Sequence, residues 1–174
     1  MPSSRKVLAA DAELASELLR AARRIGVSLY NLTNRLIEAY LSLESSGYPD
    51  PVDAALELAL IGDLTTMGFR LCPPPLDGGE AAALGEMLWR IASSRERSPD
   101  PKQVLVKLAS LLVGRRRIML SVSGETRVVI GLPEGREGAM LAEMLTGFAR
   151  AAFGERLSVH SRANVLELRI SEPR

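Results

Sequence analysis

The side chains best suited to catalysis or metal binding are few in this chain, and they stand far apart. His160 is the only histidine and Cys72 the only cysteine. A cluster of His and Cys metal ligands is therefore hard to build within one chain, even with carboxylates added. No Ser-His-Asp spacing, paired-carboxylate motif or nucleophile elbow stands out. The sequence thus predicts no enzyme activity, no metal and no cofactor, and Cys72, beside three prolines, is expected to be a small buried hydrophobe.

Two other stretches have the composition of an anion site. Arg115–Arg117 is the densest basic run and can contact phosphate, although such a run is more often a solvated entry to a strand. The stretch GLPEGREG (131–138) precedes a helical pattern and can cradle an anion at the helix N-terminus. It lacks the Lys-Ser/Thr ending of a phosphate loop and the glycine spacing of a dinucleotide site. A plain strand-to-helix turn is therefore the favoured interpretation.

The elements that must position these residues form a ββαββ unit over residues 115–171. Apolar residues recur at every second position in 116–132, which predicts a hairpin of two strands. A helix over 136–154 and strands at 157–160 and 164–170 complete the unit. The strands contain no aromatic residue for base stacking, so the sheet is not expected to bind RNA. One face of the sheet needs cover from the preceding helices or from a partner subunit.

Proline and glycine divide the chain into domains. The stretch SSGYPDP (45–51) is hostile to helix and predicts a linker. A second stop, SPDP (98–101), places Asp100 and Pro101 to open a further helix. The predicted organisation is an N-terminal domain at 1–46, a linker at 47–51 and an α/β domain at 52–174, with its helices at 52–113.

Composition places the chain among globular proteins. Its hydrophobic fraction of 47% and charged fraction of 25% are those of a folded domain. The net charge of +1 predicts no strong overall attraction to nucleic acid or membrane. A single cysteine cannot form an intramolecular disulfide, and the apolar runs are too short to span a bilayer. We therefore expect a cytoplasmic protein with no membrane partner.

The most informative pattern lies near the N-terminus. RKVLAA (5–10) has extended character, and Asp11 can cap a first helix. Gly26 can end that helix in a left-handed conformation, and Ser28 can cap the next one. The expected buried stripe of this second helix comprises Leu29, Leu32, Leu36, Tyr40 and Leu43. One strand and two helices enclose little volume, so we expect a twofold dimer that pairs the strands and interlocks the helices.

This stretch resembles the ribbon-helix-helix DNA-binding family over residues 5–44, about a quarter of the chain. The residues that carry the resemblance are Gly26-Val27-Ser28, Leu32, Leu36-Ile37 and Tyr40-Leu41, which stand where the family's second helix has them. The implied fold class is α+β. It comprises an N-terminal ribbon-helix-helix dimerisation unit, a helical middle segment and a C-terminal ββαββ sheet-plus-helix unit.

The resemblance also implies a mode of DNA contact. In that family the paired strands lie in the major groove, and the second helix offers its first backbone N–H groups to phosphates. Base contacts are assigned to the outward strand residues, and phosphate contacts to the start of the second helix with Lys6 as a supplement. The implied DNA-binding residues are Arg5, Lys6, Val7, Ala9, Val27 and Ser28.

Three functions are compatible with these observations. The first is a homodimeric DNA-binding protein of transcription-regulator type, bound to double-stranded DNA. Its C-terminal unit would sense a small-molecule effector in a pocket beside Trp89, or extend the oligomer. The alternative is a non-DNA-binding assembly protein that uses the N-terminal unit only as a dimerisation clasp, since residues 1–48 carry six basic and five acidic side chains. A short antitoxin is a third option, weakened because residues 51–174 have the pattern of a folded domain.

Overall fold

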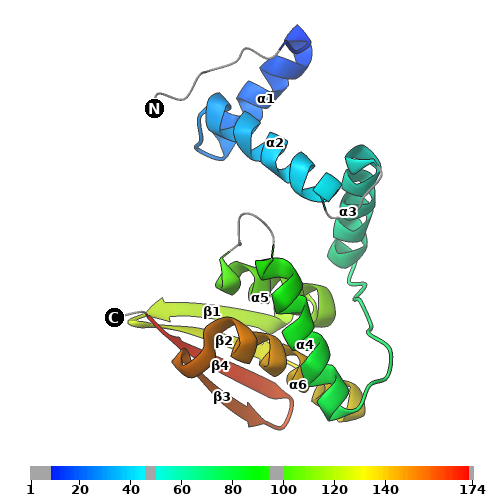
Figure 1. Cartoon of the computed structure of the whole chain (residues 1–174), viewed down its shortest axis with the longest axis vertical. Helices are drawn as coiled ribbons and strands as arrows, with labels where there is room; N and C mark the ends of the chain where they lie inside the picture. Colours follow the sequence, from blue (N-terminus) through cyan, green and yellow to red (C-terminus); the bar gives the residue numbers. More distant parts are fainter. Residues whose placement is uncertain (1–8, 46–49, 95–99, 173–174) are drawn as a thin grey trace. The chain divides into compact units, whose positions relative to one another are not determined.

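The computed structural model describes residues 9–45, 50–94 and 100–172 of the 174-residue chain. It forms two compact units, Met1–Leu58 and Ala59–Arg174. The first elements are the helices α1 (Ala12–Arg24), α2 (Leu29–Ser45) and α3 (Pro51–Thr66) (Figure 1). Of the predicted linker, residues 47–49 lie outside the described part, and Pro51 begins α3.

Helices α1 and α2 begin and end at the residues that the sequence indicates. The Asp11 carboxylate accepts the backbone N–H groups of Glu13 and Leu14 at 2.8 and 3.2 Å, which caps α1. At the other end, Gly26 takes a φ of 70°, a left-handed conformation that favours glycine. Ser28 then caps α2, because its hydroxyl oxygen accepts the Asn31 N–H at 3.1 Å. The predicted helix, glycine turn and helix are therefore confirmed.

The predicted N-terminal ribbon-helix-helix fold is nevertheless wrong. Within the described residues, the N-terminal unit is helical and contains no strand. Ala9 and Ala10, the last residues of the expected strand, are exposed coil that runs directly into the Asp11 cap, and residues 5–8 lie outside the described part. The physical reason is that a capped start, a glycine stop and apolar residues at helical spacing are requirements of any helical hairpin. The α+β class itself holds, since the sheet belongs to the C-terminal unit.

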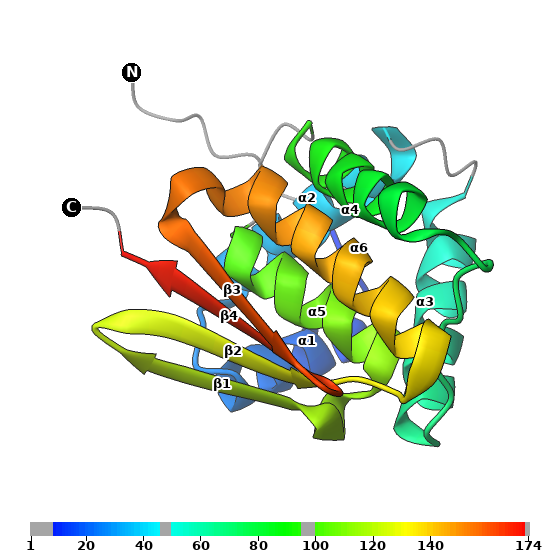
Figure 2. The same ribbon diagram turned by 90° about the horizontal axis from the view of Figure 1, so that it is seen from below.

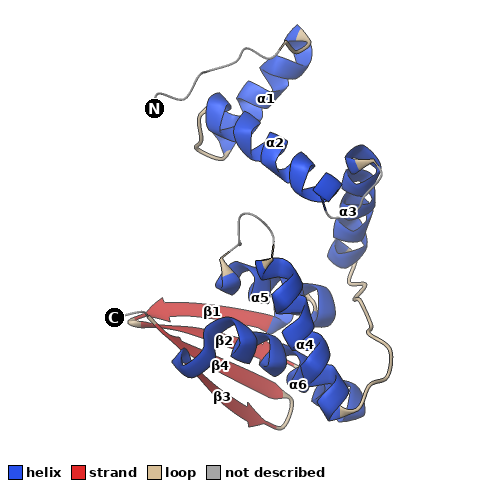
Figure 3. Cartoon of the chain, viewed as in Figure 1, coloured by secondary structure: helices blue, strands red, loops and turns tan. Residues whose placement is uncertain are grey.

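The C-terminal unit is one antiparallel sheet with helices on one of its faces (Figures 2 and 3). Its helices are α4 (Gly78–Ser93), α5 (Pro101–Val113) and α6 (Gly135–Phe153), and its strands are β1 (Ile118–Ser123), β2 (Glu125–Gly131), β3 (Leu157–Arg162) and β4 (Val165–Ser171). The strand order is β1-β2-β4-β3, with every neighbouring pair antiparallel. Strands β1 and β3 are thus the edges. The expected order of two strands, a helix and two strands is observed.

The core lies between the sheet and helices α5 and α6. Alternate residues of β2 and β4 point into it and are buried: Val128, Ile130, Leu166, Leu168 and Ile170. They meet α6 through Leu141, Met144, Leu145 and Phe148 and α5 through Leu105. The period-two pattern of the strands therefore predicts the buried face correctly.

Helix α4 joins this core by packing very closely against α6. A Cβ atom at Gly85 would lie 1.9 Å from the Met144 carbonyl oxygen, and one at Gly147 would lie 2.1 Å from the Ala82 carbonyl oxygen. The two helix backbones are in direct contact where these glycines stand. One turn further along, Trp89 packs edge-on against Phe148, with ring centroids 5.6 Å apart and planes at 74°. Trp89 thus belongs to the α4–α6 contact.

Candidate functional site

The predicted DNA contact stays a prediction, because half of its six residues lie outside the described part of the chain. Arg5, Lys6 and Val7 lie outside it, and Ala9 is exposed coil before α1. The Val27 N–H donates to the Ala22 carbonyl at 3.0 Å as part of the turn that ends α1. The Ser28 hydroxyl oxygen is occupied by the α2 cap. Of the backbone N–H groups predicted to bind phosphate, that of Val27 therefore already has a partner in the hairpin.

The glycine-rich loop 131–138 is a turn whose glycines have structural reasons. A Cβ at Gly138 would lie 1.9 Å from the Pro133 carbonyl oxygen, so only glycine lets α6 approach the loop this closely. A depression of about 450 Å³ lies beside it, but its lining includes the carboxylates of Glu134 and Glu143. These carboxylates would repel an anion. The strand-to-helix turn that the sequence favours agrees with this geometry.

The remaining sequence candidates lie on the surface. Arg115–Arg117 form an exposed 3-10 turn that leads into β1. Cys72 is exposed, so the prediction of a buried hydrophobe at this position is wrong: its loop, between α3 and α4, is not packed over the thiol. In the residues that the structure describes, His, Cys, Asp and Glu side chains form no group of three able to hold a metal ion.

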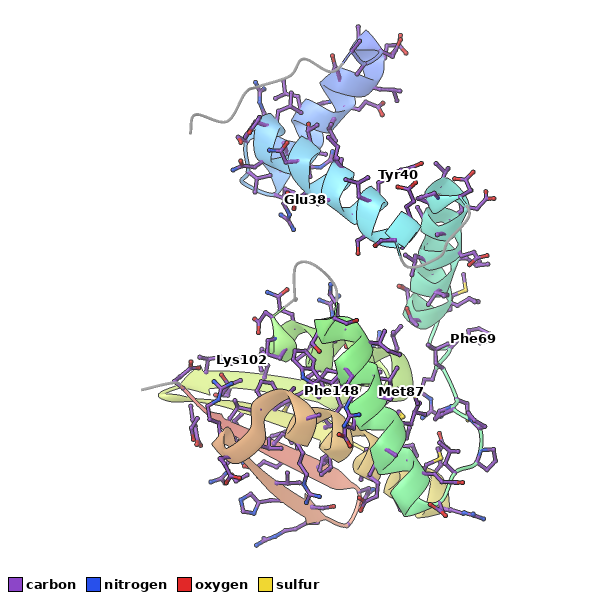
Figure 4. All side chains as sticks on the ribbon, in the orientation of Figure 1. Glu38, Tyr40, Phe69, Met87, Lys102 and Phe148 are labelled. Atoms are coloured by element: carbon purple, nitrogen blue, oxygen red, sulfur yellow. The ribbon has the colours of Figure 1, made fainter. Side chains whose placement is uncertain are left out.

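A first candidate surface consists of exposed apolar side chains on α2. In the described chain no residue of this helix is buried. Its exposed large apolar residues are Tyr30, Leu36, Ile37, Tyr40 and Leu41. Leu36, Ile37, Tyr40 and Leu41 follow Tyr30 by six, seven, ten and eleven residues. These spacings place all five side chains on one face of the helix. We call these five residues the α2 apolar face; Tyr40 is labelled in Figure 4. Leu36 and Tyr40 were expected in a buried stripe, and the packing within the N-terminal unit leaves both exposed.

Helix α3 also carries exposed apolar side chains, and they lie on more than one side of the helix. Its exposed apolar residues are Val52, Leu56, Leu58, Leu60 and Leu64, and Leu56 is 65% exposed. Only Pro51 and Ala54 of this helix are buried within the described residues. A helix that is apolar on all sides is ordinarily buried against other elements. Helix α3 therefore carries more apolar surface than its neighbouring elements cover.

A second candidate surface is the sheet face opposite α5 and α6, which we call the open sheet face. Arg127 on β2 stands directly opposite Arg169 on β4. Like charges at such a position repel. The Glu167 carboxylate resolves the repulsion, because one of its oxygens accepts the Nε–H groups of both arginines at 2.6 Å. Both ion pairs are made through the Nε atom of the guanidinium.

The electrostatics of this cluster keep Glu167 ionised. The hydrogen bond from Arg169, followed by that from Arg127, lowers the pKa of the Glu167 carboxyl below its ordinary value. The same hydrogen bond raises the pKa of Arg169. Two guanidinium groups thus favour the ionised form of the carboxyl group between them. The arginines remain partly exposed, at 49% and 42% of their side chains, and can accept an anion on their outer edges.

A shallow depression of about 570 Å³ surrounds this cluster. Its lining residues are Arg127, His160, Arg162, Val165, Glu167 and Arg169. Three arginines and one carboxylate give it a formal charge of +2, three minus one, with His160 neutral. Planar guanidinium groups match the geometry of phosphate and carboxylate. This site is not visible in the sequence because its residues come from three strands, and only the strand register brings them together.

Comparison with protein-family models, curated proteins and solved structures gave no match for this chain. The ribbon-helix-helix resemblance therefore depends on the sequence pattern alone. Among the described residues, no helix has both the length and the apolar character needed to cross a membrane.

Proposed function

We propose that this chain is a self-associating assembly protein whose copies join through the apolar surface of its first helices. The observation that carries the proposal is the α2 apolar face, five large apolar residues on a helix without a buried side chain in the described structure. Burial of such residues stabilises each by about 1.5–3 kcal/mol. These side chains are 38–58% exposed, so an association that covers them would gain part of that stabilisation.

The size of the N-terminal unit supports the same conclusion. Of its described residues, the buried apolar side chains are Ala22, Pro51 and Ala54, all of them small. A unit of 58 residues with so little core needs a further source of stability, such as oligomerisation. Association would bury the α2 apolar face and complete a core that one copy lacks.

A second copy of the chain is the partner that the charges favour. Helices α1 and α2 together contain four arginines and four glutamates, so their formal charge is zero. Two copies therefore do not repel each other at this surface. A twofold contact also places the same apolar face on both sides, which makes it self-complementary.

The open sheet face favours a second candidate function, the binding of an anionic partner. The supporting observation is the pair Arg127 and Arg169 held by Glu167 beside Arg162. A phosphate-bearing ligand, whether a small effector or duplex DNA, has the charge and geometry that this face would accept. The sequence-based prediction of DNA binding thus stays a prediction, and its contact would be this face.

Analytical ultracentrifugation of the full chain tests the main proposal. We expect a dimer that dissociates on dilution. Replacing Leu36 and Leu41 by glutamine keeps good helix formers but removes apolar surface, and should raise the dimer Kd about tenfold or more. Arg35→Gln is the matched control, since Arg35 lies on the opposite side of α2 and should leave the Kd unchanged. A wild-type chain that stays monomeric at high micromolar concentration would overturn the proposal.

A further inference from the structure

The edge strand β1 has none of the features that normally protect a sheet edge. Its sequence, IMLSVS, contains no charged residue and no proline. Its exposed apolar side chains are Met119 at 68%, Leu120 at 54% and Val122 at 68%. The opposite edge, β3, carries His160 and Arg162. Sheet edges in soluble proteins are ordinarily blocked by charges, prolines or bulges, because their free N–H and C=O groups can pair with another strand.

The exposed residues of β1 lie on both faces of the sheet, and two of them continue the core row. Leu120 stands opposite Val128, and Val122 stands opposite Thr126, so both lie on the face that α5 and α6 cover elsewhere. Val128 and Thr126 are buried. The helices on this face do not reach the end of β1, because the tip of the β1–β2 hairpin extends past α5 (Figure 2). An added strand would therefore extend the apolar row of the core.

We propose that β1 pairs antiparallel with β1 of a second copy, joining the two C-terminal units into one continuous eight-stranded sheet. The sequence of β1 is complementary to itself in this arrangement. Directly opposite residues of an antiparallel pair lie on the same face, so a twofold axis perpendicular to the sheet must set one residue opposite its own copy. Centred on Leu120, the pairing sets Leu120 against Leu120 and Ile118 against Val122. Centred on Ser121, it sets Leu120 against Val122.

Both registers place apolar residues against apolar residues on the core side and bring no two like charges together. Because opposite residues of an antiparallel pair share a face, both registers keep the apolar row of each copy on the core side. The contact is also independent of the α2 apolar face, because it uses another unit and the sheet backbone. It goes beyond the proposed function, and either can fail while the other holds.

Disulfide trapping in the full chain tests the pairing directly. In a Cys72→Ser background, which removes the only native cysteine, the variants are Leu120→Cys and Ser121→Cys. Opposite Cα atoms in an antiparallel pair lie about 4.5–5.5 Å apart, within the range that a disulfide spans. Under mild oxidation we expect a covalent dimer from at least one variant. Ser158→Cys, on the β3 edge, is the matched control and should give about tenfold less.

A second variant separates this contact from the helical one. Val122→Lys places a charge on the exposed edge without removing a buried group, and should lower the disulfide yield about tenfold. The dimer formed through the α2 apolar face should then persist. In the Leu36→Gln/Leu41→Gln chain the opposite is expected: weaker association overall, with trapping through β1 still observed at high concentration.

Three outcomes would overturn the inference. One is equal trapping of the cysteines placed on β1 and on β3, which would show random collision. Another is no trapping at either β1 position. The third is protection of the thiol of the Ser121→Cys variant from a maleimide in the monomer, which would show that a segment of the same chain covers the edge.

Discussion

At the scale of single residues, Glu167 is the most consequential side chain on the open sheet face. Its carboxylate accepts hydrogen bonds from two arginines that would otherwise repel each other across the β2–β4 pair. The same two bonds lower its pKa, so its stabilising effect depends on pH. A carboxyl group whose pKa is lower in the folded than in the unfolded protein stabilises the folded state at pH values above its unfolded pKa. This stabilisation is lost as the pH falls through the folded pKa.

Glu167→Gln therefore has a pH-dependent effect on stability. At pH 7 we expect the variant to melt at a lower temperature than the wild type, because the glutamine leaves the opposed arginines without a counter-charge. The difference should shrink as the pH falls below the ordinary carboxyl value of 4.5, where the wild-type carboxylate is lost too. Thermal denaturation at several pH values measures this. Glu134→Gln, an exposed carboxylate in the 131–138 loop, is the control, and a difference independent of pH would contradict the assignment.

The residue scale is also where sequence reasoning was weakest. Arg127 lies forty residues before Glu167, and Arg169 lies two residues after it on the same strand. Only the strand register shows that the three side chains converge. Cys72 was expected to be buried because cysteine side chains are buried on average, whereas its position in a loop leaves it exposed. Helix caps were easier: Asp11, Ser28 and Asp100 act on their immediate neighbours, so local sequence suffices.

At the scale of elements, helices α4 and α6 pack with their backbones in direct contact. Gly85 and Gly147 allow the two backbones to touch, and Trp89 closes the contact against Phe148. Sequence periodicity predicted α6 within a residue or so of Gly135–Phe153, because its apolar stripe is long and regular. It could not predict that two glycines on separate helices face each other's backbone.

Gly85→Ala tests this contact, because alanine is otherwise the better helix former. The added methyl would meet the Met144 carbonyl at 1.9 Å, so a helix must shift. Such overpacking costs about 1–3 kcal/mol, which outweighs the gain of about 1 kcal/mol in helix propensity. Gly62→Ala in α3 is the matched control: no atom lies within 4 Å of that Cβ, and we expect a gain in stability. Urea unfolding followed by Trp89 fluorescence and by circular dichroism measures both, and a stabilising Gly85→Ala would contradict the close contact.

The N-terminal elements show why a correct helix prediction led to a wrong fold. The turn at Gly26 and the cap at Ser28 are as the sequence indicates. These signals specify where helices end, but they do not specify what precedes or covers them. The large apolar residues of α2 are exposed within the N-terminal unit, so association with a second copy stays part of our proposal although the ribbon does not.

At the scale of the whole molecule, the proposed β1 pairing has a consequence for the open sheet face. Pairing of β1 strands about an axis perpendicular to the sheet keeps the open faces of both copies on the same side. Two depressions of formal charge +2 would then lie on one continuous surface, whereas the whole chain carries only +1. Two linked binding sites bind a long anion more tightly than one, through effective concentration.

This arrangement predicts how the protein binds a polyanion. We expect a fluorescently labelled duplex DNA to bind with an affinity that falls steeply as salt rises, because phosphate contacts release counterions. Replacing Arg127 and Arg169 by glutamine removes two contacts and should reduce the slope of log K against log salt by about 1.8. The matched control replaces Arg136 and Arg150, two exposed arginines on α6, by glutamine and loses the same charge elsewhere.

The outcomes separate the ligand classes and the oligomer. Val122→Lys should weaken duplex binding while leaving inorganic pyrophosphate binding unchanged, since only the long ligand reaches both depressions. Binding of pyrophosphate without duplex binding would support an effector site and make the DNA prediction wrong. Equal loss in the α6 control would show a diffuse charge effect, because the arginines held by Glu167 would then have no special role. Unchanged affinity after loss of Arg127 and Arg169 would show that the open sheet face does not bind the ligand. These are the two guanidinium groups that the Glu167 carboxylate holds in place.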